Sequence, residues 1–248
     1  MTAHRGRASG PLDAVFLTFC LAVLGFFVLY PCLRLFVAAV AHGPFDVAAS
    51  PAGRIALRNT VVISFASVLT SGALGTALAF LFTRRAFPGG RWAAALAYLP
   101  FTLPPLVGVV SFYYLVGRDG LVPRFLEQAL GVSGAYLEGP AAILAVHTYS
   151  FYVYFYAMVS AALENLDRSQ LEAARTLGAG RLLMMRSVLF PMLRPALAGA
   201  SLLTFMSSGA SFSAPLIFGN DFPMLSVLIY TEQQQFHADS AVSLTLAL

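Results

Sequence analysis

The chain has 248 residues, of which 58% are hydrophobic and only 10% are charged, and its formal net charge is +4. Soluble domains carry about 25% charged residues, so this composition excludes a soluble globular protein and predicts a polytopic membrane protein. All 15 basic residues are arginine. Because a P-loop needs a lysine to reach the nucleotide phosphates, the chain cannot itself be a P-loop ATPase.

The first apolar run covers about residues 12–40. A signal peptide has an apolar region of only about 7–15 residues, whereas a spanning helix needs about 20, so the run predicts an uncleaved transmembrane helix. Cys20 and Cys32 both lie in it. Helix geometry separates them by roughly 18 Å, which is too far for a disulfide.

The second apolar run, at about residues 57–82, has a small residue at every fourth position: Ser67, Ser71, Gly75 and Ala79. Small residues at this spacing let two helices approach closely in lipid, so we expect this face to pack against another helix.

The third apolar run, at about residues 92–116, contains Pro100, Pro104 and Pro105. Each proline removes a backbone donor and frees a carbonyl one turn earlier. A helix broken at membrane depth is tolerated where it is buried or lines a cavity, and transporters place such breaks near their substrate. The three prolines therefore indicate either a simple kink or part of a transport path. A short interfacial helix is predicted after them, at about residues 123–130.

The fourth apolar run, at about residues 140–163, has His147 as its only ionisable side chain well inside. An ionisable residue within the membrane is a candidate functional group. The alternative is a histidine hydrogen-bonded to a neighbouring Tyr or Ser. The fifth run, at about residues 195–218, carries Thr204, Ser208 and Ser211 on one predicted helical face. These hydroxyls either line a path or join two helices.

The last part of the chain is expected to be a polar connection over residues 219–238, followed by a sixth apolar run from about Asp239. Only about nine residues of that run are present, which is too few to span a bilayer. We expect the native gene to continue beyond Leu248 and to complete this helix.

Between the fourth and fifth runs lies a charged segment, residues 171–191, with the sequence LEAARTLGAGRLLMMRSVLFP. Asp167 and Gln170 suit the start of a helix, and good helix formers follow. Gly178 suits a left-handed turn at the end of that helix. A second short helix is predicted from about Arg181 to Leu189 and is expected to end at Pro191. The two helices would form a compact knob at the membrane surface.

This segment resembles the cytoplasmic Glu-Ala-Ala loop of permease subunits in type I, binding-protein-dependent ABC importers. It has Glu172-Ala173-Ala174, three residues, Gly178, nine residues, and then Val188-Leu189-Phe190-Pro191. Val188 and Phe190 depart conservatively from the family pattern. Three further segments carry the resemblance: the basic turn at 84–91, Leu-Pro-Phe-Thr-Leu-Pro-Pro at 99–105 and Ser-Phe-Ser-Ala-Pro at 211–215. The last two are most similar to the iron(III) branch, with thiamine, polyamine and phosphonate permeases close behind.

The resemblance implies an all-α polytopic helical bundle, with the type I transmembrane domain at residues 57–248. Residues 1–56 would hold the cytoplasmic N-terminus, the first transmembrane helix and an external loop. In this family two six-helix units form the pore, so a second permease unit is expected, as a fused half or a separate subunit. The chain is then the first half of such a fusion or a truncated single unit.

The resemblance also implies which partners act with the chain. The loop at 164–194 would dock on a separate ATPase subunit through Glu172, Ala173, Ala174, Gly178 and Pro191. That subunit uses ATP, whereas this chain binds no cofactor and no nucleic acid. A periplasmic binding protein would deliver the cargo, for which ferric iron is the first expectation.

The distribution of arginines predicts the orientation in the bacterial inner membrane, because cytoplasmic loops are enriched in basic residues. With the N-terminus in the cytoplasm, ten arginines lie inside and five outside. The loop at 164–194 is then cytoplasmic. The five external arginines are Arg34, Arg54, Arg58, Arg118 and Arg124.

Two other classes of protein fit the sequence less well. An ion-coupled secondary transporter is also polytopic, but such carriers usually hold carboxylates or histidine chains inside their helices. Here every Asp and Glu falls in a loop or at a predicted helix end. A membrane-embedded enzyme would need a catalytic constellation, and the sequence has no Ser/His/Asp set, no His-Glu-x-x-His and no cysteine cluster.

Overall fold

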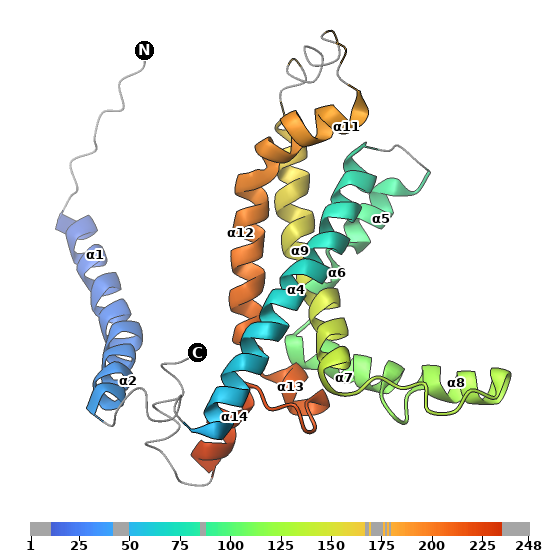
Figure 1. The fold of residues 1–248 in the computed structure, drawn as a ribbon. Helices are drawn as coiled ribbons and strands as arrows, with labels where there is room; N and C mark the ends of the chain where they lie inside the picture. The colour runs from blue at the N-terminus through green and yellow to red at the C-terminus, as the bar shows by residue number, and fades with distance from the viewer. Residues whose placement is uncertain are drawn as a thin grey trace.

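The computed structural model describes residues 11–41, 50–84, 88–166, 169, 176, 178 and 180–234, and this part of the chain is helical and contains no strand. Figure 1 shows its helices. They are α1 (Pro11–Leu24), η1 (Gly25–Leu29), α2 (Tyr30–Ala41), α4 (Pro51–Arg84), α5 (Gly90–Leu96), α6 (Leu99–Thr102), α7 (Pro105–Val116), α8 (Leu121–Leu130), α9 (Gly139–Glu164), α11 (Arg181–Met184), η2 (Met185–Leu189), α12 (Phe190–Gly209), α13 (Ser213–Phe218) and α14 (Leu225–Gln234).

Within the residues that the structure describes, four helical segments are long and apolar enough to cross a membrane: residues 13–34, 51–83, 139–164 and 182–209. A fifth candidate is a bent pair, Gly90–Thr102 and Pro105–Leu130, whose two limbs meet at 107°. The prediction of an all-α polytopic bundle is therefore confirmed. The break that the three prolines predicted in the third run is also present. The predicted short helix at 123–130 is present as α8, and its place at an interface stays a prediction.

Three long helices, α4, α9 and α12, form the central bundle and pack against one another. The small residues of α4 face this contact: Ser67, Ser71 and Ala79 are fully buried. A Cβ on Gly75 would collide with the backbone carbonyl oxygen of Tyr152 on α9. The predicted packing role of this face is confirmed, because the absence of side-chain bulk allows the two backbones to approach.

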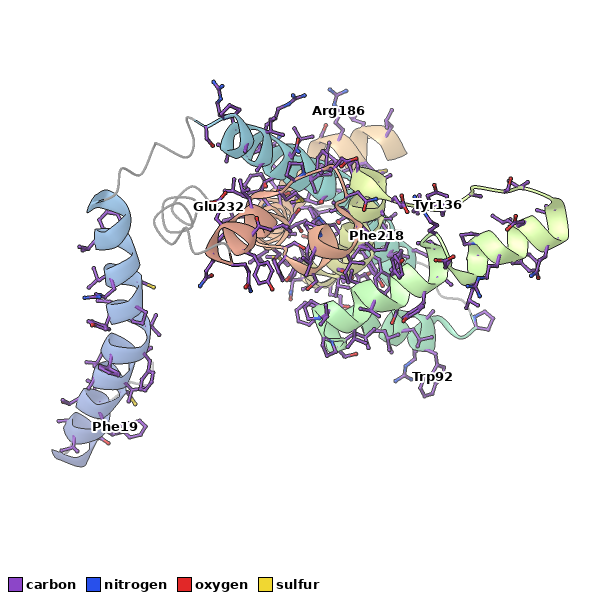
Figure 2. All side chains as sticks on the ribbon, turned by 90° about the horizontal axis from the view of Figure 1, so that it is seen from below. Phe19, Trp92, Tyr136, Arg186, Phe218 and Glu232 are labelled. Atoms are coloured by element: carbon purple, nitrogen blue, oxygen red, sulfur yellow. The ribbon has the colours of Figure 1, made fainter. Side chains whose placement is uncertain are left out.

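Large apolar side chains on the outer surfaces of the helices remain exposed, as expected for a protein that is solvated by lipid. Figure 2 shows Trp92 pointing away from the rest of the chain, whereas Phe218 lies among other side chains. Trp92 is 79% exposed and Phe218 is 1% exposed. An apolar surface of this kind is stable in hydrocarbon and unfavourable in water.

The break between α5 and α7 leaves backbone carbonyls without intrahelical donors, and two tyrosines of α9 supply the missing hydrogen bonds. The Tyr152 hydroxyl donates to the Ala97 carbonyl at 2.9 Å, and the Tyr156 hydroxyl donates to the Ala94 carbonyl at 3.2 Å. Both tyrosine side chains are buried. Irregular backbone at membrane depth is tolerated only when its polar groups are satisfied in this way.

The prediction that Pro191 ends a short helix is wrong. Residues 181–209 form one helix, in which Pro191 is the second residue of α12. The wide turn η2 precedes it, and the Phe190 N–H donates to the Met185 carbonyl, five residues back. A proline ring clashes with the carbonyl four residues before it, and a π turn widens the helix at that point, so the helix continues. The π turn η1 precedes Pro31 at the same spacing, since it also ends two residues before the proline.

Two further expectations about the fifth run and its sequel need correction. The fifth run is not one helix to Phe218, because α12 ends at Gly209 and α13 begins at Ser213. Residues 219–238 are not simply a polar connection either, since they contain α14, whose first residue, Leu225, is buried. The Leu225 N–H donates to Thr60 Oγ1 on α4 at 2.9 Å, so α14 begins against the bundle. The sixth run, from Asp239, lies outside the described residues.

The ends of the bundle separate the loops into two groups. Figure 1 shows the end of α4 and the start of α5 at the same end as α11, and α8, α13 and α14 at the opposite end. The described parts of the two segments that carry most of the arginines predicted to be cytoplasmic therefore lie at one end of the bundle. The loop that holds Arg118 lies at the other.

Candidate functional site

A cavity of about 520 Å³ lies where the two helix breaks meet. Helices α6 and α7 and the break between them contribute Pro100, Pro104 and Pro105, α9 contributes His147, and the break between α12 and α13 contributes Ser211. Five of the seven residues predicted to line a path therefore share one cavity. None of the described side chains that line it is a carboxylate, a lysine or an arginine.

His147 lies at the wall of this cavity and is buried, with 1% of its side chain exposed. Its Nδ1 lies 3.0 Å from Ser67 Oγ and 3.0 Å from Ser208 Oγ. Its Nε2 lies 2.9 Å from Ser211 Oγ. Ser208 Oγ also donates to Ser67 Oγ at 3.2 Å. The alternative of a histidine hydrogen-bonded to neighbouring hydroxyls is thus confirmed, and the same residue also faces the cavity.

The three hydroxyls predicted for the fifth run separate into three different roles. Ser208 is buried and joins α12 to α4 and α9 through Ser67 and His147. Ser211 lies beyond the end of α12, bonds to His147 and lines the cavity. Thr204 is fully buried, and its hydroxyl has no hydrogen-bond partner among the described residues. The structure therefore does not place Thr204 at the cavity.

Further lining residues were not singled out from the sequence, and five of them come from α9: Val146, Tyr149, Ser150, Phe151 and Tyr154. The ring of Tyr154 stands edge-on to that of Phe101, with centroids 5.8 Å apart. The ring of Phe151 lies 5.0 Å from that of His147. Ser207 Oγ donates to the Tyr154 hydroxyl at 3.3 Å. The cluster of aromatic residues in the fourth run was the available signal, but a helix pattern alone does not show which of its faces meets a broken helix.

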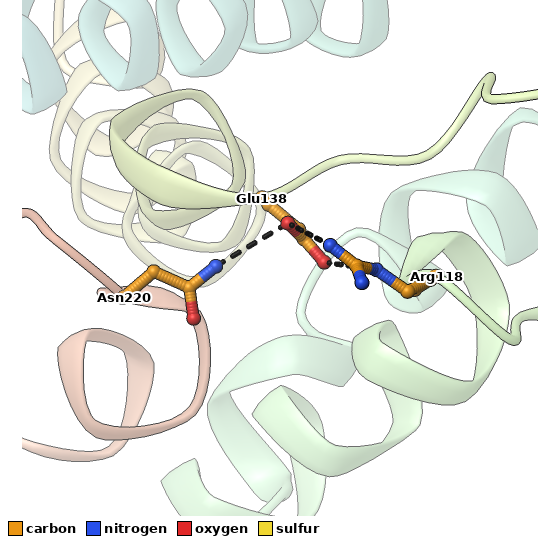
Figure 3. A network of polar contacts seen from close by, with 3 residues as sticks. All are labelled: Arg118, Glu138 and Asn220. Atoms are coloured by element: carbon orange, nitrogen blue, oxygen red, sulfur yellow. Dashed lines mark hydrogen bonds and ion pairs between the residues drawn. The ribbon is translucent and has the colours of Figure 1, made fainter.

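A second polar group lies outside the cavity, where three loops meet (Figure 3). Arg118 donates to both carboxylate oxygens of Glu138, from Nε at 3.1 Å and from Nη2 at 3.3 Å. Asn220 Nδ2 donates to Glu138 Oε2 at 3.3 Å. The guanidinium of Arg118 also lies 5.2 Å from the ring centre of Tyr136. The hydrogen bonds to Glu138 favour the charged guanidinium and raise the pKa of Arg118.

The predicted coupling loop is described only in part. Glu172, Ala173 and Ala174 lie outside the described residues. Gly178 has φ +77°, so the prediction of a left-handed residue at this position is confirmed. Nothing lies within 4 Å of where a Cβ on Gly178 would stand. Glycine is therefore required there by the backbone conformation and not by crowding. Pro191 lies within the long helix that leads from the loop into the bundle.

No group of three or more His, Cys, Asp or Glu side chains that could hold a metal ion occurs within the part of the chain that the structure describes. Cys20 and Cys32 are both free cysteines.

Comparison with known proteins identifies the family to which the chain belongs. The family described as "Binding-protein-dependent transport system inner membrane component" matches residues 71–248. The ferric transport system permease of Actinobacillus pleuropneumoniae is 29% identical over 83% of this chain. The chain spans only 31% of that relative.

The sulfate transport system permease protein of Salmonella typhimurium is 32% identical over 79% of this chain, and the match covers 72% of that relative. Among solved structures, a bacterial ABC transporter that imports the polysaccharide alginate shares the fold, with a TM-score of 0.74 and 18% identity over 95% of this chain and 88% of that one. The family match covers well over half of the residues. The chain belongs to the family of inner membrane components of binding-protein-dependent transport systems, the ABC importer permeases, which transport solutes and carry no ATPase site of their own.

Proposed function

We propose that this chain forms the translocation path of an ABC importer in the bacterial inner membrane, with the cavity between the two helix breaks as part of that path. The observation that carries the proposal is the meeting of those breaks at one cavity. Transporters place discontinuous helices at their substrate sites because freed backbone groups can then face the solute. The matched family and the shared fold support the same function.

Energy would come from a separate ATPase subunit that docks on the loop at residues 164–194. A periplasmic binding protein would deliver the cargo at the opposite end, and a second permease unit would complete the pore. A structure of the alginate transporter in complex with its periplasmic protein supports this arrangement. The clustering of the predicted cytoplasmic segments at one end of the bundle supports an N-terminus in the cytoplasm.

We propose ferric iron as the first cargo to test, because the sequence resemblance and a ferric permease relative both favour it. An inorganic oxyanion is the second candidate. The similarity to a sulfate permease supports it. The described cavity wall also has hydroxyl groups but lacks the carboxylates that hard cations prefer. The ligand that co-purifies with the partner binding protein would distinguish the two.

Coupling is tested by replacing Gly178 with Val in the reconstituted importer. The left-handed backbone at Gly178 makes a residue with a Cβ unfavourable by roughly 1–2 kcal/mol. We expect Gly178→Val to insert normally, since the apolar segments are unchanged, but to lose most of the stimulation of ATP hydrolysis by the binding protein. Glu172→Ala should show the same loss in milder form.

The matched control is Gly180→Val, two residues away. Gly180 has no positive φ, and a Cβ there would also meet nothing within 4 Å. We expect this variant to retain stimulated ATP hydrolysis. Normal stimulation in Gly178→Val, at normal abundance of the permease in the membrane, would show that this loop does not couple the two subunits.

A further inference from the structure

The buried hydroxyls around His147 restrict where its ring proton can lie. Apart from His147 Nδ1, the hydroxyls of Ser67 and Ser208 have only each other as hydrogen-bond partners among the described residues. If Nδ1 carries no proton, Ser208 donates to Ser67 and Ser67 donates to Nδ1, so that both hydroxyl protons are used. If Nδ1 carries a proton, it accepts no bond, and the two hydroxyls share a single contact along which only one of them can donate. One buried donor is then left without an acceptor, which is unfavourable.

The neutral ring must then carry its proton on Nε2, the nitrogen that faces Ser211. The Nε2–H donates to Ser211 Oγ across 2.9 Å. A hydroxyl that receives this bond does not donate back along it, and the described residues offer Ser211 Oγ no other acceptor. Ser211 lines the cavity. Its own O–H is therefore available to donate into the cavity.

We propose that His147 is a positioning residue, which Ser67 and Ser208 hold with its proton on Nε2 so that Ser211 presents a hydrogen-bond donor to an oxyanion in the cavity. This inference rests on the proposed function of the cavity as a transport path, and it favours the second candidate cargo. Oxyanions form strong hydrogen bonds with hydroxyl donors, and the described cavity wall holds no carboxylate that would repel an anion.

The position of the ring proton is tested by nitrogen NMR of the full chain in lipid, labelled with ¹⁵N-histidine. The chain has four histidines, and His147→Gln identifies the signal of His147 by its loss. We expect an unprotonated Nδ1 and a protonated Nε2. Ser67→Ala and Ser208→Ala should each leave this state unchanged, because either hydroxyl alone lies 3.0 Å from Nδ1. The double variant should give a mixture of the two neutral forms. A proton on Nδ1 in the unmodified chain would overturn the proposal.

The binding of an oxyanion near Ser211 is tested by adding sodium sulfate to the same sample. We expect sulfate to shift the Nε2 signal of His147, because a Ser211 hydroxyl that donates to sulfate becomes a stronger acceptor for the ring N–H. Sodium chloride at the same ionic strength should not shift it. Ser211→Ala should abolish the response, and Ser211→Thr, which retains a hydroxyl, should restore it.

An unshifted signal at saturating sulfate, or an equal shift with chloride, would refute the oxyanion site. The coupling assay on Gly178 does not depend on this measurement. Loss of the sulfate response with intact coupling would therefore refute this inference and leave the proposed function standing.

Discussion

Among the glycines of the central bundle, Gly75 leaves the least room for a Cβ. A Cβ at this position would stand 2.7 Å from the Cβ of Phe155 and would also collide with the carbonyl oxygen of Tyr152. Neither atom is the end of a flexible side chain, so α4 and α9 would have to move apart. Overpacking of this kind typically costs about 1–3 kcal/mol.

We therefore expect Gly75→Ala to lower the thermal unfolding midpoint of the purified chain in detergent. Gly108→Ala is the matched control, because Gly108 also lies within a helix and a Cβ there would meet nothing within 4 Å. Alanine at Gly108 should leave the midpoint unchanged or raise it slightly, since alanine favours helix. Equal midpoints for the two variants would contradict the close contact of α4 and α9.

At the residue scale, local chemistry predicted some features well and others not at all. The left-handed Gly178 and the small residues of α4 follow from rules that act within a few residues. The hydrogen-bond partners of His147 could not be predicted from such local rules. Ser67 is 80 residues before it and Ser208 is 61 residues after it, so only the packing of three helices shows that these groups meet.

At the scale of the element, the wide turn η2 explains how a proline lies inside the helix that leads from the loop to the bundle. Pro191 lacks the N–H that would donate to the Ser187 carbonyl, and the turn before it shifts the register of the helix by one residue. One residue of α-helix corresponds to a rotation of about 100°. The orientation of residues 181–184 relative to the bundle thus depends on this turn.

Pro191→Ala restores the missing N–H, and we expect the turn to revert to regular α-helix. Spin labels at Leu182 and Leu203, in a background with Cys20→Ser and Cys32→Ser, should then show an altered distance. A reference pair of labels at Val62 and Leu203 lies entirely within the bundle, so the distance between these two labels should not change. All three label sites are exposed. An unaltered distance for the first pair would show that the turn does not depend on the proline.

The errors in predicting the elements have one common reason. A pattern of apolar residues does not show where a helix is interrupted. The run 195–218 contains no proline between Pro195 and Pro215, yet the helix stops at Gly209. Helix α14 is short, and polar residues flank its apolar part, so it resembled a connection. Both features depend on contacts with α4, α7 and α9 that are distant in sequence.

At the scale of the whole molecule, the arginine distribution makes a prediction about sidedness. Residues 84–91 and 164–194 should face the cytoplasm, and residues 118–139 should face the periplasm. In the background without Cys20 and Cys32, single cysteines at Gly89, Ser169 and Gln128 test this with a membrane-impermeant thiol reagent. Only the cysteine at Gln128 should react in intact spheroplasts. Reaction of the cysteine at Gly89 in intact spheroplasts would show that the orientation is the reverse of the predicted one.

The contact between α14 and α4 has a consequence for the order in which the molecule forms during synthesis. Leu225 bonds to Thr60, which is 165 residues earlier, and the Pro223 carbonyl accepts from Asn59, which is 164 residues earlier. The first long helix of the bundle therefore leaves the ribosome well before its last partners exist. Until about residue 225 has been inserted, the side-chain amide of Asn59 must be satisfied by water or by the insertion machinery, whereas the Thr60 hydroxyl already donates to the Ala56 carbonyl of its own helix. The beginning of α4 is thus among the last parts of the bundle to reach its final environment.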